Sequence, residues 1–164
     1  MFEPSENVGE EFFRYLVESH ELGHDGFHGQ DHWHRVLING RMLASATGAN
    51  LKVVELFALI HDSRRENEAY DPEHGLRAAQ HALELHRTWF DATDAEMALL
   101  TEACRFHSDG FTDGDLTVQA CWDADRLDLG RVGIRPSAKY LCTHHAKRPE
   151  VIEAAYERSL SIRL

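Results

Sequence analysis

A chain of 164 residues, with 43% apolar and 27% charged side chains, is long enough to bury one hydrophobic core without disulfides or a structural metal. Its net charge of −11 at pH 7 argues against a broad nucleic-acid-binding or anionic-membrane-binding surface, although it does not exclude a small phosphorylated substrate bound locally. The chain has no signal-peptide pattern, no apolar run of the roughly 18 residues that span a bilayer, and three widely spaced cysteines. These features predict a cytoplasmic protein, and they leave its oligomeric state open.

Apolar side chains recur at helical spacing in seven segments, and no segment of more than a few residues alternates as a strand would. Asp71 and Pro72 have the residue types of an N-cap and a first helical position, and Thr93 with Glu96 forms a capping-box pair. We therefore predict an all-α fold, an irregular helical bundle in a single domain. The expected helices cover about 5–22, 32–47, 51–62, 72–89, 93–107, 115–129 and 149–162.

The segment 51–62 is the most apolar of the seven and ends on two side chains that can bind metal. From Val53 to Ile60 only Glu55 is polar, so this helix is predicted to be buried on nearly all sides. His61 and Asp62 would then emerge inside the core, where a divalent cation would offset the cost of burying them. The alternative is a histidine that caps the helix and an aspartate that begins a turn.

Other polar residues lie where their helices should face inward. Asp125 continues an apolar stripe that contains Val118 and Trp122, and it therefore needs a partner. His32 begins the inward stripe of the second helix, and His107 extends that of the fifth. His74 lies in the first turn of the fourth helix, where the helix dipole keeps an imidazole neutral for ligation. Each of these residues has an alternative role as a hydrogen-bonded core residue.

The order of these residues resembles the HD-domain superfamily of metal-dependent phosphohydrolases. The matching text is HWHRV at 32–36, LFALIHDSRR at 56–65 and DADRL at 123–127, and the resemblance covers about residues 28–135. It implies a single HD-like domain over 1–164, with the helices 5–22 and 149–162 packed on that core. It further implies that one divalent metal is bound by His32, His61, Asp62 and Asp125. Mixed nitrogen and oxygen ligands favour Mn, Fe, Co, Ni or Zn over Mg.

Two points modify this resemblance. His34 competes with His32 as first ligand, and we choose His32 because the family usually places that ligand three residues before the Arg-Val pair. His74 and His107 resemble the extra histidines of the dinuclear branch, in which Asp62 would bridge two metals. In a mononuclear enzyme the same two histidines would contact substrate phosphate or act as a general acid.

The mechanism that the resemblance implies is hydrolysis of a phosphate ester of a nucleotide or other small phosphorylated molecule by a metal-activated water. Arg64 and Arg65 would neutralise charge on the phosphoryl group, and Glu66 would orient the water. The alternative for these three is an exposed polar loop. Basic residues recur after Asp125, and 130–147 is a long connection with little periodicity, so we expect either a lid over phosphate or exposed loop charges there. The candidates are Arg126 for catalysis and Arg131, Arg135 and Lys139 for substrate binding.

Two other enzyme classes and one non-enzymatic class compete with this prediction. HELGH at 20–24 has the spacing of a zinc protease, but Gly23 and Gly26 interrupt the helix that this motif requires. The dinuclear branch includes a few di-iron oxygenases. A non-catalytic metal-binding or ligand-binding module would bind tightly without turnover.

Overall fold

The computed structural model describes residues 2–23 and 26–161. In this part of the chain seven α-helices form, with two short 3₁₀ helices and no β-strand, which confirms the predicted all-α fold. None of these helices combines the length and apolar character that crossing a bilayer requires. The α-helices are α1 (Glu10–Glu18), α2 (Gln30–Thr47), α3 (Leu51–Ile60), α4 (His74–Leu85), α5 (Asp94–Phe106), α6 (Leu116–Arg126) and α7 (Pro149–Ser161), and the 3₁₀ helices are η1 (Leu129–Val132) and η2 (Ala138–Tyr140).

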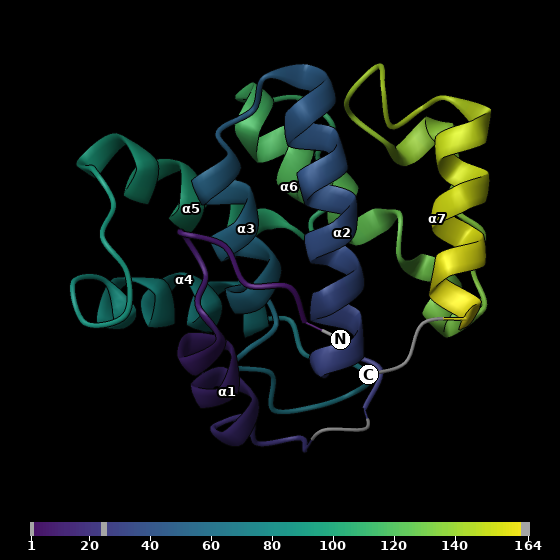
Figure 1. The fold of residues 1–164 in the computed structure, drawn as a ribbon. Coiled ribbons are helices and arrows are strands. Elements are labelled where there is room, and N and C mark those ends of the chain that lie inside the picture. The colour runs from purple at the N-terminus through teal and green to yellow at the C-terminus, as the bar shows by residue number, and fades with distance from the viewer. Residues whose placement is uncertain (1, 24–25, 162–164) are drawn as a thin grey trace.

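Helix α3 is the centre of the bundle, as its apolar sequence predicts. Every residue from Val53 to Ile60 is buried, and α3 contacts α1, α2, α4, α5 and α6. Its one polar member, Glu55, is compensated because its carboxylate accepts hydrogen bonds from Arg41, Ser5 and Asn7 at 2.7–2.8 Å. Helices α4 and α5 lie on one side of the α2–α3 pair and α7 on the other (Figure 1).

The helix boundaries follow most of the local signals. Thr93 and Glu96 form the predicted capping box of α5. The predicted start of α4 is wrong, because the helix begins at His74 rather than Pro72. The Asp71 carboxylate does not cap it; instead it accepts from the Glu66 backbone N–H at 2.8 Å and from Arg77 at 2.6 Å. Helix α1 is shorter than predicted, and residue 162 of the seventh predicted helix lies outside the described residues.

Two glycines allow neighbouring helices to approach each other closely. A Cβ at Gly40 of α2 would lie 2.5 Å from a Val54 side-chain carbon of α3. A Cβ at Gly75 of α4 would lie 2.6 Å from the carbonyl oxygen of Arg105 in α5. The first contact joins the C-terminal half of α2 to the start of α3, and the second brings the start of α4 toward the end of α5.

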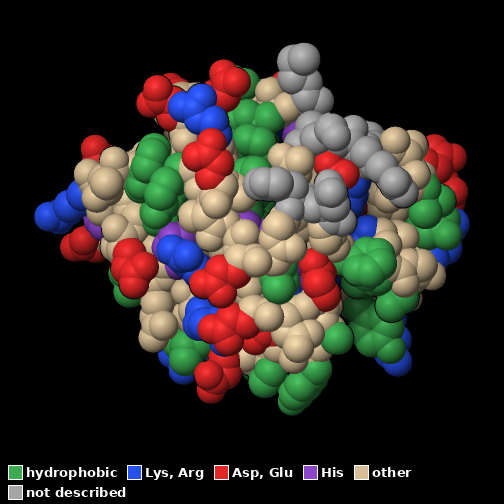
Figure 2. All heavy atoms as spheres, turned by 90° about the horizontal axis from the view of Figure 1, so that it is seen from below, with side chains coloured by type: hydrophobic (Ala, Val, Ile, Leu, Met, Phe, Trp, Pro, Cys, Tyr) green, Lys and Arg blue, Asp and Glu red, His purple; other side chains and the backbone are tan. Residues whose placement is uncertain are grey.

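The connection after α6 is ordered by buried polar contacts. The Asp123 carboxylate accepts hydrogen bonds from the backbone N–H groups of Cys142 and Thr143 at 2.7 and 2.8 Å. Helix α7 follows and packs on η1 and α2. On the face shown in Figure 2, Asp and Glu side chains are spread over much of the surface while histidine shows only in small areas, because most of the histidine rings described below are buried.

Candidate metal centre

Three helices bring the four residues of the predicted first metal site together. His32 lies in the first turn of α2, His61 and Asp62 follow α3, and Asp125 lies in the last turn of α6. The Nε2 atoms of His32 and His61 are 3.0 Å apart. His32 Nε2 lies 3.5 Å from Asp62 Oδ2 and 3.4 Å from Asp125 Oδ1. His61 Nε2 lies 3.6 and 3.8 Å from the same two carboxylate oxygens, so each of the two imidazole nitrogens lies within 4 Å of both carboxylates.

A second histidine pair lies on the other side of Asp62. The Nε2 atoms of His74 and His107 are 2.9 Å apart, and they lie 3.6 and 3.4 Å from Asp62 Oδ1. Asp62 thus presents Oδ2 to the first histidine pair and Oδ1 to the second.

The hydrogen bonds of the first pair fix where its ring protons lie. His32 Nδ1 is 2.7 Å from the Asp128 carboxylate, and His61 Nδ1 is 3.1 Å from the Phe57 carbonyl oxygen. Because an ionised carboxylate and a carbonyl only accept, each Nδ1 carries its hydrogen. In the neutral rings both Nε2 lone pairs then face each other across 3.0 Å, which requires a proton or a cation between them.

The second pair repeats this pattern. His107 Nδ1 donates to the Cys104 carbonyl oxygen at 2.7 Å, and His74 Nδ1 donates to the carbonyl oxygen of Asp71. Two Nε2 lone pairs again point at the same space beside Asp62. These imidazole nitrogens and carboxylate oxygens could hold a metal ion.

The protonation states agree with this geometry. Burial opposes a charge on His32, but hydrogen bonds to Asp125, Asp128 and Asp62 raise its pKa to about 9. Burial lowers the pKa of His61 to about 3. In the second pair burial lowers the pKa of His74, while the hydrogen bond and charge of Asp62 outweigh burial and raise that of His107.

Three arginines face the same centre across a cavity of about 280 Å³. Arg65 lies 3.5 Å from Asp62 Oδ1, and an Arg131 nitrogen lies 3.8 Å from Asp125 Oδ1. Arg126 is 9% exposed, and one of its terminal nitrogens is buried without a hydrogen-bond partner among the described residues. The cavity is lined by His28, Asp62, Arg65, His74, His107, Ser108, Gly110, Asp125, Arg126, Leu129 and Arg131.

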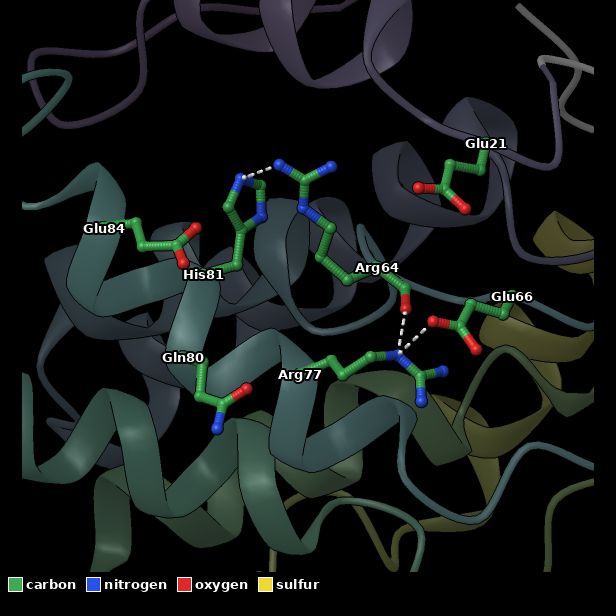
Figure 3. A pocket seen from close by; sticks show the side chains of 7 residues that line it. All are labelled: Glu21, Arg64, Glu66, Arg77, Gln80, His81 and Glu84. Carbon is green, nitrogen blue, oxygen red and sulfur yellow. Dashed lines mark hydrogen bonds and ion pairs between the residues drawn. The ribbon is translucent and has the colours of Figure 1, made fainter.

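The turn after α3 sends its charged side chains to two different cavities. Asp62 and Arg65 line the cavity of about 280 Å³ beside the candidate metal centre, because residues three apart share a face of a helical turn. Arg64 and Glu66 instead line a second cavity of about 330 Å³ (Figure 3). There an Arg64 terminal nitrogen lies 3.1 Å from His81 Nε2. The structure therefore places Arg64 and Glu66 away from the candidate metal centre.

Three further residues also lie apart from the centre. Arg135 is exposed and pairs with Glu153, and the Lys139 ammonium lies 5.2 Å from the centre of the Tyr140 ring. His34, the alternative first ligand, is buried and belongs to none of the clusters of metal-competent atoms among the described residues.

Two residues of the centre were not identified from sequence. Asp128 holds His32, and its position three residues after Asp125, on the same helical face, was the signal for it. His28 precedes α2, four residues before His32, and its Nδ1 is 2.8 Å from Asp62 Oδ2. Sequence analysis assigned neither residue a role in holding a metal.

Residues 20–23 of the HELGH segment are not helical, whereas a zinc protease needs this motif on a helix. Helix α1 ends at Glu18, so His20 lies beyond it, and His20 Nδ1 is 3.4 Å from the carbonyl oxygen of Ser63. His24, the second histidine of the motif, lies outside the described residues.

The fold is similar to that of a solved protein. That protein is a predicted HD superfamily hydrolase from an uncultured Thermotogales bacterium, with a TM-score of 0.69 and 29% sequence identity. The match covers 92% of this chain and 86% of the other. No family model matches the sequence. No curated protein matches it either.

Proposed function

We propose that this chain, which belongs to the HD-domain superfamily, is a metal-dependent hydrolase that cleaves a phosphate ester of a nucleotide or other small phosphorylated molecule. The observation that carries the proposal is the buried arrangement of four imidazole Nε2 atoms around the two oxygens of Asp62. Three guanidinium groups face this arrangement across one cavity, which supplies a site for an anion.

His32, His61, Asp62 and Asp125 would hold one cation, and His74 and His107 would hold a second that shares Asp62. The ligand types favour Mn, Fe, Co, Ni or Zn. When bound, such a cation lowers the pKa of a coordinated water and polarises a phosphoryl oxygen. Asp62 and Asp125 stay ionised and able to bind a cation, because the adjacent imidazoles lower their pKa values by more than burial raises them.

The arginines would bind the phosphoryl group of the substrate. The buried unpartnered nitrogen of Arg126 gives it a free donor toward a phosphoryl oxygen. Arg65 and Arg131 already lie near Asp62 and Asp125, so they would neutralise charge at the reacting centre as the ester bond breaks. Arg64, Glu66, Arg135 and Lys139 take no part in this proposal, because they lie elsewhere.

Metal content and turnover test the proposal together. The purified chain loaded with Mn²⁺, Co²⁺ or Ni²⁺ should bind two ions and hydrolyse members of a nucleotide and sugar-phosphate panel. Asp62→Asn should remove metal binding and turnover, and His107→Ala should reduce the bound metal to one ion. Asp113→Asn, at an exposed loop carboxylate, is the matched control. Absence of turnover with every metal across the panel would overturn the assignment as a phosphohydrolase.

The shared carboxylate also supports a second candidate, a di-iron oxygenase. Two histidine pairs around one bridging Asp62 would hold two irons as readily as two other divalent ions. This function predicts two irons per chain after anaerobic purification, and oxygen consumption with an organic substrate. The arginine-lined cavity favours the hydrolase, and a native metal other than iron would remove the oxygenase.

A further inference from the structure

The second cavity, on the other side of the turn that follows α3, carries charged groups that the proposed hydrolase does not use (Figure 3). Its volume of about 330 Å³ is within the roughly 300–1,000 Å³ of sites for small molecules. It shares no lining residue with the cavity beside the candidate metal centre. A molecule bound there would therefore be additional to the substrate of the proposed hydrolase.

One arginine of this cavity carries a charge that no carboxylate of the described residues neutralises. A terminal nitrogen of Arg64 donates to His81 Nε2 at 3.1 Å, and within residues 2–23 and 26–161 this is the only hydrogen bond of the Arg64 side chain. Burial, reinforced by the charge of Arg64, lowers the pKa of His81 to about 4, so the imidazole is uncharged near neutral pH. The other N–H groups of the guanidinium remain free to bind an anion.

The imidazole of His81 holds this guanidinium in place. His81 is buried, and its Nδ1 lies 2.8 Å from Ser63 Oγ. The Ser63 hydroxyl donates its one hydrogen to the Ile60 carbonyl oxygen at 2.8 Å. His81 Nδ1 must therefore donate to Ser63, which leaves Nε2 as an acceptor for Arg64. A donor that is already held in position loses less conformational entropy when a ligand binds.

Two glutamates of the same cavity are also unpaired. Glu21 and Glu84 lie on opposite sides of that guanidinium in Figure 3, and neither has a hydrogen bond or ion pair with another residue in the described part of the chain. The other charged side chains of the cavity have partners of opposite charge. Arg77 donates to both carboxylate oxygens of Asp71 at 2.6 Å, and Glu66 lies 3.5 Å from Arg77. The unpaired charges are therefore one positive and two negative.

We infer that this cavity binds a free basic amino acid, whose carboxylate pairs with Arg64 and whose two cationic groups pair with Glu21 and Glu84. The complement of one positive and two negative groups is a ligand with one negative and two positive groups. An anion alone would meet an excess of negative charge, and a diamine would be opposed by the guanidinium between the two glutamates. Lysine carries the required set of charges. The inference does not depend on the proposed function.

Ligands that each lack part of this set test the inference on the full chain. Isothermal titration calorimetry should give L-lysine a dissociation constant roughly tenfold lower than that of cadaverine, which lacks the carboxylate, because a hydrogen bond between charged groups has about this effect. Norleucine lacks the side-chain ammonium and should bind roughly two- to fivefold more weakly than lysine, since an ion pair with an exposed carboxylate contributes less. Acetate, which has only the carboxylate, should bind more weakly than lysine.

Substitutions at the two kinds of charge should affect these ligands differently. Arg64→Gln should raise the dissociation constant of lysine roughly tenfold and should not weaken binding of cadaverine, because only lysine has a carboxylate for Arg64. Glu84→Gln should weaken binding of both ligands. Arg135→Gln and Glu102→Gln are the matched controls, because these two exposed residues do not line the cavity. Both controls should bind lysine as the unaltered chain does.

The outcomes decide the inference and leave the proposed hydrolase untouched, because none of the measurements requires metal or turnover. Absence of lysine binding, equal affinities for lysine and cadaverine, or acetate binding as tight as that of lysine would overturn the inference. A lysine affinity that Arg64→Gln leaves unchanged would also overturn it. If Arg64→Gln fails to fold, the comparison of ligands on the unaltered chain and the exposed variant Glu84→Gln still decide the question. Lysine binding that Arg64→Gln weakens and Arg135→Gln does not supports the inference.

Discussion

His32 and Asp128 form a buried pair in which the ring Nδ1–H donates to the carboxylate over 2.7 Å, and neither side chain is more than 1% exposed. Arg35 Nε holds the second carboxylate oxygen at 2.7 Å. Asp128 therefore fixes the ring orientation that points His32 Nε2 at Asp62 and Asp125. Such carboxylate–histidine pairs also raise the basicity of the metal-facing nitrogen.

We expect Asp128→Asn to weaken metal binding by roughly 10- to 100-fold, because the amide can turn an N–H group toward the ring and holds its orientation poorly. Titration calorimetry with Mn²⁺ measures the effect. Asp113→Asn should leave the affinity unchanged. An affinity for Mn²⁺ in Asp128→Asn equal to that of the unaltered chain would show that Asp128 does not position the ligand.

Gly75→Ala should remove the second metal position. The added Cβ would meet the Arg105 carbonyl oxygen at 2.6 Å, and backbone cannot swing aside as a flexible side chain would. Helix α4 would shift away from α5, separating His74 from His107. We expect a loss of about 1–3 kcal/mol in the free energy of unfolding, as overpacking costs, and a change from two bound metals to one by elemental analysis.

Gly9→Ala provides the control for that variant, because nothing lies within 4 Å of the added Cβ. It should retain both metals. Two metals in Gly75→Ala would mean that the α4–α5 contact does not set the position of His74.

Arg126→Gln should weaken binding of inorganic phosphate to the metal-loaded chain. The change removes a buried guanidinium with a free donor, and a hydrogen bond to a charged group contributes about 1.5–3 kcal/mol. The dissociation constant for phosphate should therefore rise by at least tenfold in a competition assay. Arg135→Gln removes an exposed arginine that pairs with Glu153, and should change the constant little. Equal effects of the two substitutions would refute a specific role for Arg126.

The lowered pKa of His81 predicts how the free energy of unfolding depends on pH. Burial, reinforced by the charge of Arg64, lowers the pKa of His81 from 6.5 to about 4 (Figure 3). Between these values the unfolded chain binds a proton that the folded chain does not, so the free energy of unfolding falls as pH is lowered from 6.5 to 4. The contribution of this group reaches about 3 kcal/mol.

Urea unfolding at several pH values measures this dependence. His81→Gln should show a shallower loss of stability than the unaltered chain between pH 6.5 and 4. The pKa values of His61 and His74 are also lowered, so these residues contribute in the same direction, and the quantity of interest is the difference between the two proteins. Parallel pH profiles would show that His81 titrates alike in the folded and unfolded chains.

The fold class could be predicted from sequence because its signals are local. Helical spacing of apolar residues and the Thr93 capping box depend on neighbours within one turn or two. The start of α4 could not be predicted in the same way. Asp71 has the residue type of an N-cap, but Arg77 and the Glu66 backbone compete for its carboxylate, and that competition depends on how the preceding loop folds.

At the candidate site, the sequence identified the histidine and aspartate side chains that lie close together. It was less successful for the charged residues around them. His61 and Asp62 stand out because they end an apolar run, and that signal does not depend on tertiary structure. Arg64 and Arg65 are adjacent residues of the same type, so the sequence does not distinguish them. The geometry of the turn directs Arg64 to one cavity and Arg65 to the other. The metal-ligand roles themselves stay predictions that metal analysis tests.

Because both oxygens of Asp62 are engaged by opposite histidine pairs, the two halves of the centre are not mechanically independent. A rotation of this carboxylate that shortens its distance to one pair lengthens its distance to the other. A substitution that raises the affinity of one histidine pair for a cation would therefore lower the affinity of the other pair, unless compensating changes occur on α2 or α4. The affinity of each half would have to be adjusted through the groups behind the imidazoles rather than through the residue between them.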